Sequence, residues 1–233
     1  MLSVNTVPPR LKPGVRPRNE MANQDWFRRQ VWSAGDERDF FARLGRSRTQ
    51  FHKAQYLRIQ ASVLADTDDD SLIRTALALL QKLFAEFPEP SQLPLAYIQA
   101  AKCYERLADL PKATEQFRLA LVAEARIPTI DSRASIEFPW FVVCHGLSNL
   151  HDEAVAVLDT ADLVFPVQRF KAAAVRAFVA NGRGQAASAA EHAREALDAA
   201  ETRRSPFSRH PSMGLVGQEY RSMVERLGKI AAV

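Results

Sequence analysis

The stretch "YIQAAKCYERLADLPKATEQFRLAL" at residues 97–121 decides the fold of this chain. Its alanine and aromatic residues recur at spacings of three and four, which predicts two amphipathic helices. Small residues let two helix backbones approach each other, and aromatic side chains fill the remaining gaps. Because the turn "LADLP" between the halves is short, we expect the two helices to pack antiparallel. The expected contact residues are Tyr97, Ala100, Ala101 and Tyr104 in the first helix and Ala113, Phe117 and Ala120 in the second.

The pattern of the second helix recurs along the chain, in copies that start at Ala76, Ala113, Ala154 and Ala189. The intervals between these alanines are 37, 41 and 35 residues. This pattern resembles the tetratricopeptide repeat, in which units of about 34 residues each form a helical hairpin. The resemblance implies an all-α fold, a right-handed α-solenoid of about four degenerate hairpins with flanking helices at both ends. In "FHKAQYLRIQASVLADT" and "RHPSMGLVG" the chain is also similar to an uncharacterised group of bacterial repeat proteins, which brings no known activity.

The first 24 residues differ from the rest of the chain. They hold four prolines and four basic residues and show no apolar period, which predicts an extended or disordered Pro/Arg-rich arm. Met21 opens a more protein-like sequence and is a candidate for the true translation start. Residues 25–233 are expected to form a single repeat domain. Its last helix, at about 217–231, would cap the apolar end of the solenoid.

Two helix starts are marked by their sequence. Ser47 and Gln50 stand three residues apart, which fits a capping box before the helix that follows. The acidic run at residues 66–70 lacks the glycine and the distal glutamate of a calcium loop. We therefore expect these acids to cap a helix that begins near Ser71.

The composition excludes several classes of protein. Two cysteines cannot build a disulfide framework, which favours a reducing compartment and a cytoplasmic location. The longest apolar run, residues 138–144, is too short to cross a bilayer, and no secretory signal is recognisable, so we expect no membrane contact. Cys103 and Cys144 fall at equivalent places of neighbouring pairs, too far apart for a disulfide, and are interpreted as small buried residues.

Catalytic and metal-binding motifs are missing from the sequence. It contains no HExxH or CxxC spacing, no GxSxG turn and no phosphate-binding loop. The glycines in "NGRGQ" at residues 181–185 are better explained as a turn between two helices. We therefore predict neither enzymatic activity nor a metal ion or cofactor.

A protein-binding groove is implied by the repeat resemblance, because the first helix of each pair lines the concave surface in such proteins. Counting positions on those helices gives five cations and one tryptophan. Arginine pairs well with carboxylates and tryptophan is a flat apolar anchor, so an acidic or extended protein segment is the expected partner. The function expected is that of a non-catalytic scaffold or adaptor in a bacterial cytoplasm. The groove residues are Arg58, Lys102, Arg106, Trp140, Arg169 and Arg176.

Three alternatives stay open. The groove cations could be ordinary solvated charges, with Trp140 filling the long linker before it. Residues 1–58 carry 12 basic and 5 acidic residues, so this region could contact nucleic-acid phosphates or be a solvated arm and helix face. An enzyme could also use His210, which stands among arginines in a Pro/Ser/Gly-rich loop, although a structural strap across the last helical pair explains that loop better.

Overall fold

The computed structural model describes residues 25–232, and the regular elements in this range are all helices. The all-α prediction is therefore confirmed for the described part of the chain. The described residues fall into two compact units, divided along the chain after Glu89, and each unit is described by itself. The arm predicted for residues 1–24, with its candidate start, lies outside the described residues. No helix of the described range is long and apolar enough to span a membrane.

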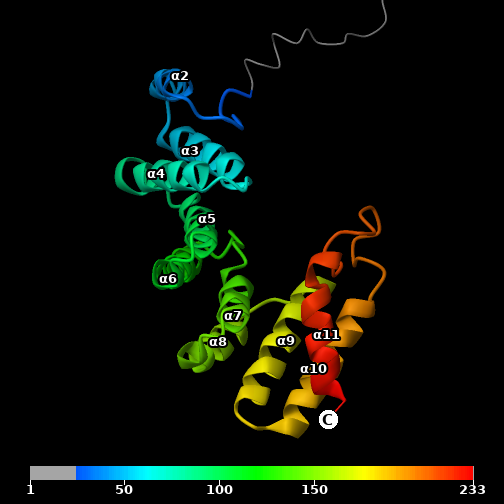
Figure 1. Ribbon diagram of the computed structural model, residues 1–233. Coiled ribbons are helices and arrows are strands. Elements are labelled where there is room, and N and C mark those ends of the chain that lie inside the picture. The colour runs from blue at the N-terminus through cyan, green and yellow to red at the C-terminus, as the bar shows by residue number, and fades with distance from the viewer. Residues whose placement is uncertain (1–24, 233) are drawn as a thin grey trace, which may run out of the picture. The chain divides into compact units, whose positions relative to one another are not determined.

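The first unit contains a short helix followed by a helical pair. α2 spans Ala34–Gly45, α3 spans Gln50–Ala65 and α4 spans Asp70–Glu86, and α3 packs along α4 (Figure 1). Apolar residues at spacings of three and four bring leucines such as Leu57 and Leu80 fully into the interior. These buried faces hold the pair together.

The helix starts in this unit follow from short polar side chains. The carboxylate of Asp69 accepts a hydrogen bond of 2.8 Å from the amide of Ser71, so the predicted acidic cap is confirmed. The cap predicted at Ser47 is wrong, because the hydroxyl of Thr49 accepts the bond from the amide of His52 at 3.2 Å. Ser47 instead donates its own amide to the carbonyl of Leu44, which keeps it in the turn after α2.

The second unit contains three helical pairs and a last helix. In each pair the second helix packs against the first (Figure 1). Two short 3₁₀ helices, η1 and η2, precede α8 and α11. The elements are α5 (Leu93–Arg106), α6 (Leu110–Arg126), α7 (Ala134–Cys144), η1 (Ser148–Leu150), α8 (His151–Leu158), α9 (Pro166–Gly182), α10 (Ala186–Glu201), η2 (Gln218–Tyr220) and α11 (Arg221–Ala231).

The pair α5/α6 confirms the helices predicted from residues 97–121. Ala101, Ala113 and Ala120 are fully buried between them, and Phe117 is 1% exposed. The turn is made by Ala108, whose φ of 58° is in the left-handed region. The same core continues into the next pair through apolar residues of α7 and α8.

The last helix of the described range lies against the third pair. α11 packs against α10 and α9 (Figure 1), and its Met223 and Leu227 are buried in one core with Phe170 and the alanines of both helices. Such a helix removes an apolar end from water. The helix begins later than predicted, because residues 218–220 form the tighter 3₁₀ turn.

The loop before α11 is fixed to the start of α9. The amide of Val167 donates to the carbonyl of Gly214 at 2.9 Å, and the ring of Phe207 packs on Phe165 at 5.4 Å. Gly214 has a φ of +70°, and a Cβ there would lie 2.6 Å from Cγ of Phe165. Only glycine tolerates both the left-handed φ and the lack of space for a Cβ atom. The loop is therefore a strap, and His210 within it is exposed.

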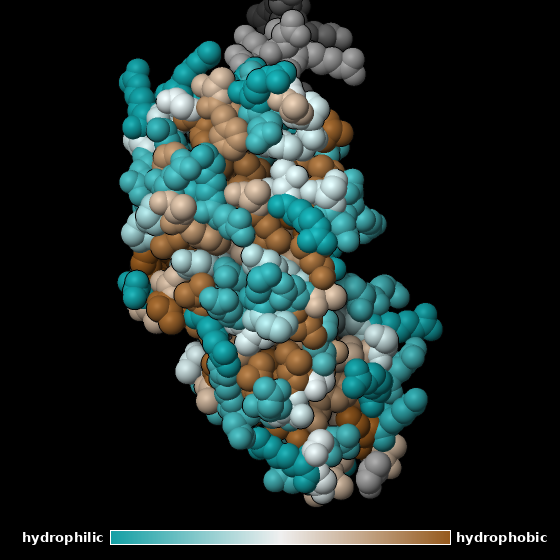
Figure 2. Space-filling model, turned by 60° about the vertical axis from the view of Figure 1, so that its left-hand side comes forward, coloured by the Kyte–Doolittle hydropathy of each residue, from teal (hydrophilic) through white to brown (hydrophobic). Residues whose placement is uncertain are grey.

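Exposed large hydrophobic residues are scattered in the described range. Figure 2 shows the hydrophobic residues of the face in view as separate patches among hydrophilic ones. Single exposed apolar residues are ordinary on protein surfaces. They are Val31, Phe51, Leu119, Val122, Val164, Phe207 and Met213.

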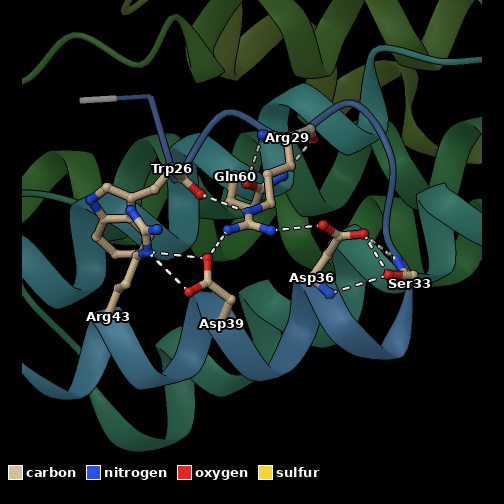
Figure 3. A network of polar contacts seen from close by, with 7 residues as sticks. All are labelled: Trp26, Arg29, Ser33, Asp36, Asp39, Arg43 and Gln60. Carbon is tan, nitrogen blue, oxygen red and sulfur yellow. Dashed lines mark hydrogen bonds and ion pairs between the residues drawn. The ribbon is translucent and has the colours of Figure 1, made fainter. Parts of the chain in front are cut away.

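A polar network around Arg29 ties the segment before α2 to the first unit (Figure 3). Its guanidinium donates to Asp36 at 2.7 Å, to Asp39, and to the carbonyl of Trp26 at 3.1 Å. Its backbone amide and carbonyl bond to the side-chain amide of Gln60 at 2.9 and 2.7 Å. Gln60 is fully buried on α3, and this pairing satisfies its amide there.

The carboxylate of Asp36 is held ionised in the same network. Hydrogen bonds from the hydroxyl and the amide of Ser33, and then from the guanidinium of Arg29, lower the pKa of Asp36 to about 2. Ser33 and Asp36 also cap α2 reciprocally. Since this carboxylate is favoured in its charged form in the folded state, it stabilises the fold above the ordinary pKa of 3.8 and ceases to do so as the pH falls toward 2.

Replacing Gln60 by Ala is expected to lower the free energy of unfolding by about 2 kcal/mol, because both backbone groups of Arg29 lose their partner. Urea unfolding followed by circular dichroism measures the change. Gln50→Ala, at an exposed position of the same helix, is the control and should change the free energy by less than about 0.5 kcal/mol. Equal stability of both variants would contradict the anchoring role of Gln60.

The Asp36→Asn variant should lose stability less steeply than the wild type between about pH 4 and pH 2. The reason is that the variant has no carboxylate to protonate at the start of α2. Urea unfolding at a series of pH values measures both slopes, with Asp162→Asn, an exposed aspartate of the second unit, as control. Identical slopes for Asp36→Asn and the wild type would show that Asp36 is not linked to folding.

Candidate binding face of the second unit

Side chains from four elements of the second unit meet around the carboxylate of Glu137 on α7. Lys171 of α9 donates to its Oε1 at 2.6 Å, and Nζ of Lys102 on α5 lies 3.5 Å from its Oε2. The rings of Trp140 on α7 and Tyr220 at the end of η2 are 5.7 Å apart. Nζ of Lys171 lies over both rings, at 5.5 and 5.7 Å from their centroids. We call these five residues the Glu137 cluster.

Local sequence explains how these side chains converge. Glu137 and Trp140 are three positions apart on α7 and therefore share a face of that helix. α7 packs against α9, and the Trp140 ring lies 5.9 Å from that of Phe170, the neighbour of Lys171. Tyr220 also contacts Phe170, at 5.4 Å between centroids. The apolar packing of these rings thus brings the charged atoms together.

Lys171 is the most buried charge of the cluster, with 9% of its side chain exposed. Burying an ammonium group is unfavourable unless it is paired. Here a carboxylate and two ring faces surround it, and the faces of aromatic rings attract cations. Lys102, in contrast, is 51% exposed and holds Glu137 at the longer distance.

The protonation states of the cluster follow from these neighbours. Burial acts to raise the pKa of Glu137, but Lys102 and then Lys171 outweigh it, so its pKa is lowered. Burial, followed by the charge of Glu137, raises the pKa of Tyr220 to about 12. At neutral pH the cluster therefore contains two ammonium groups, one carboxylate and a neutral phenol, and carries a net charge of +1.

Cys144 and His145 lie beside the cluster, where α7 ends. The His145 ring is 2.7 Å from a carboxylate oxygen of Glu105 on α5. The prediction that Cys144 is buried is wrong, because as the last residue of α7 it is exposed, whereas Cys103 in mid-helix is buried as predicted. Burial raises the pKa of the Cys103 thiol to about 11. Although Cys144 is exposed, partial desolvation by its neighbours, followed by the charge of Glu105, raises the pKa of its thiol to about 11 as well, so neither thiol is activated as a nucleophile.

Two of the predicted groove residues, Lys102 and Trp140, belong to the Glu137 cluster. Arg169 and Arg176 line a separate cleft of about 470 Å³ over α9 and α10. They are seven positions apart and share a face of α9, whereas Lys171 is two positions from Arg169 and lies on the opposite side. Arg176 also forms an ion pair of 2.8 Å with Asp159.

The other two predicted groove residues, Arg58 and Arg106, are not among the residues of the Glu137 cluster or of this cleft. Arg58 belongs to the first unit, where burial lowers its pKa. Arg106 is exposed at the end of α5. Counting positions along the helices therefore predicted residues of two separate places in the second unit. Lys102 and Trp140 lie in the Glu137 cluster, and Arg169 and Arg176 lie at the cleft.

Sequence reasoning missed Glu137 and Lys171. Both are single charges inside apolar runs, "SIEFPWFVV" and "FKAAAV". A lone acid in one buried helix and a lone base in another are expected to pair, because neither is stable when buried alone. This signal was present, but it does not say which charges meet.

Metal and catalytic groups were also sought in the described range. No group of three or more His, Cys, Asp or Glu residues there is placed to hold a metal ion. Arg203, Arg204 and Arg209 are near His210 in the sequence, and none of them forms an ion pair within the described residues. All four residues are exposed.

The described residues thus define an all-α protein of paired helices with a partly buried charge cluster on α5, α7 and α9. Comparison with known proteins gives no match to a family model, to a curated protein or to a solved structure. The resemblance to tetratricopeptide repeats therefore stays a prediction from sequence.

Replacing Glu137 by Gln is expected to lower the free energy of unfolding by about 3 kcal/mol, because Lys171 is left buried without a carboxylate. The double variant Glu137→Gln/Lys171→Met should recover most of this loss, since it removes the unpaired charge as well. Urea unfolding measures both. Glu153→Gln, which breaks the exposed ion pair with Arg118, is the control and should cost less than about 1 kcal/mol. A double variant as unstable as Glu137→Gln would refute the buried pair as the cause.

Proposed function

We propose that this protein is a non-catalytic scaffold of a bacterial cytoplasm, with degenerate tetratricopeptide-like helical pairs, that binds an acidic segment of a partner protein at the Glu137 cluster. The observation that carries this proposal is that Glu137 binds one of its two lysines closely and the other at a longer distance. Lys171 is bound at 2.6 Å and buried, whereas Lys102 lies at 3.5 Å and is half exposed. Lys102 is therefore the charge available to a partner.

The net charge of the cluster supports an anionic partner. Glu137 neutralises one of its two ammonium groups, and the remaining positive charge lies at the exposed end, on Lys102. A carboxylate that approaches Lys102 would replace a long ion pair by a direct one and meet no uncompensated negative charge.

The two aromatic rings support a peptide rather than a free ion. Trp140 and Tyr220 are partly buried and fixed by their contacts with Phe170, so an incoming chain would order few side chains on this face. Aromatic residues of this kind dominate binding energy at protein interfaces. An acidic segment with an apolar residue would use both the charge and the rings.

The protonation states argue against acid–base or nucleophilic catalysis at this face. Glu137 is held ionised by two lysines, the pKa of Tyr220 is raised to about 12, and the thiol of Cys144 has a pKa of about 11. A catalytic acid or base works best with a pKa near the operating pH. This supports a binding role.

The nucleic-acid alternative receives less support from the first unit. Asp36 and Asp39 there pair with Arg29 and Arg43, so these two arginines are less available to phosphate groups. Arg46 and Arg48 remain without an ion pair in the described residues. Binding that weakens steeply with salt would favour this alternative.

Lys102→Glu is expected to weaken binding of an acidic peptide at least about tenfold, which corresponds to 1.4 kcal/mol. The probes are fluorescein-labelled peptides with the sequence EELEDLEE and its neutral analogue QQLQNLQQ, followed by fluorescence anisotropy. Arg194→Glu, on the exposed face of α10, makes the same change of charge and should bind like the wild type.

Two results would refute the proposal. One is binding of the neutral peptide as tight as that of the acidic one. The other is an equal loss in Lys102→Glu and Arg194→Glu, which would mean that only the net charge of the protein matters.

A further inference from the structure

The first unit has a pocket of its own, of about 240 Å³, where the end of α2 meets α3 and α4. Its walls combine apolar side chains with two lysines. Leu44, which is 3% exposed, lies at its base. The lining residues are Phe41, Leu44, Gly45, Lys53, Lys82 and Phe87.

The two lysines are held at the walls of this pocket. Nζ of Lys53 lies 5.3 Å from the ring centroid of Phe87, and Nζ of Lys82 lies 5.3 Å from that of Phe41. Each ammonium group is thus attracted to an aromatic face that also lines the pocket. Because both ammonium groups lie at the walls, the centre of the pocket can accommodate an uncharged or anionic group.

The charge at this pocket is positive. Its lining holds two ammonium groups and no carboxylate. Lys82 bonds to Glu86 at 2.5 Å outside the lining, whereas Lys53 forms no ion pair within the described residues. Arg46 and Arg48, in the loop between α2 and α3, are outside this lining and form no ion pair within the described residues. An anion is therefore the favoured ligand.

Size and polarity define the ligand further. Pockets for drug-sized ligands start at roughly 300 Å³, so this one suits a smaller molecule. A bare phosphate or sulfate would leave the surfaces of Leu44 and the two phenyl rings unused. A long acyl chain would not fit.

We propose that this pocket binds a small monocarboxylate with an aromatic or branched aliphatic body. The carboxylate would lie between Lys53 and Lys82, and the apolar body would rest on Leu44 between the phenyl rings. Such a ligand matches both the charge of the rim and the apolar base. The pocket belongs to the first unit, so this inference does not depend on the function proposed for the second.

Gly45 offers a way to block the pocket without harming the fold. A Cβ at this glycine would meet no atom within 4 Å, and its φ is not in the left-handed region. Leucine also favours the helix more than glycine does. Gly45→Leu should therefore fold normally and fill the pocket with its own side chain.

The test titrates phenylacetate into the ¹⁵N-labelled full chain and follows amide resonances by NMR. We expect the amides of Gly45 and Phe87 to shift. Neutral phenylacetamide and the Lys53→Gln/Lys82→Gln variant should each show affinity reduced at least about tenfold, since they lack the charge pairing. Gly45→Leu should abolish the shifts. Lys102→Glu, in the second unit, should leave them unchanged.

The proposal is overturned if phenylacetamide binds as well as phenylacetate, if inorganic phosphate causes the same shifts, or if the shifts persist in Gly45→Leu. Absence of any shift in the wild type overturns it as well. If the double lysine variant fails to fold, Gly45→Leu and phenylacetamide still decide the question.

Discussion

The structure depends on the close approach of helices across alanine. Between α5 and α6, and again between α9 and α10, the contact residues are fully or almost fully buried alanines such as Ala101, Ala113, Ala193 and Ala196. Alanine gives up no side-chain rotamers on burial and is the best helix former, so these contacts form with little entropic cost. Alanine itself removes little apolar surface from water, however. The burial that drives folding comes from the large residues placed around these contacts, among them Phe117, Phe138, Phe141 and Phe170.

Polar residues connect elements that alanine does not bring together. Gln60 fixes the segment before α2 through the backbone of Arg29, and the Glu137 cluster links α5, α7 and α9 through ion pairs. A buried hydrogen-bonded group is satisfied in one arrangement only, because every alternative leaves it unpaired. In this protein the apolar contacts are repetitive, and the buried polar residues distinguish one pair from the next.

Spacing in the sequence was enough to predict the helices, the α5/α6 pair and the acidic cap of α4, because these depend on neighbours along the chain. The cap at Ser47 was misplaced since Thr49, two residues later, is also a good capping residue. Glu137 and Lys171 could not be paired from sequence, because which charges meet depends on how α7 packs against α9. Helix packing also explains why Arg169 and Arg176 lie at a different place from Lys102, although all three residues occur on the first helices of their pairs.

Tyr220 belongs both to the Glu137 cluster and to the turn that starts the last helix. Local opening of α11 would carry Tyr220 away from Lys171 and admit water to the ammonium group of that lysine. The face that includes Lys102 and the last helix therefore share one opening equilibrium. A ligand that binds only the closed arrangement must stabilise α11 against local unfolding. A substitution at Leu227 that populates the open arrangement must weaken binding of that ligand in proportion to the closed fraction that is lost.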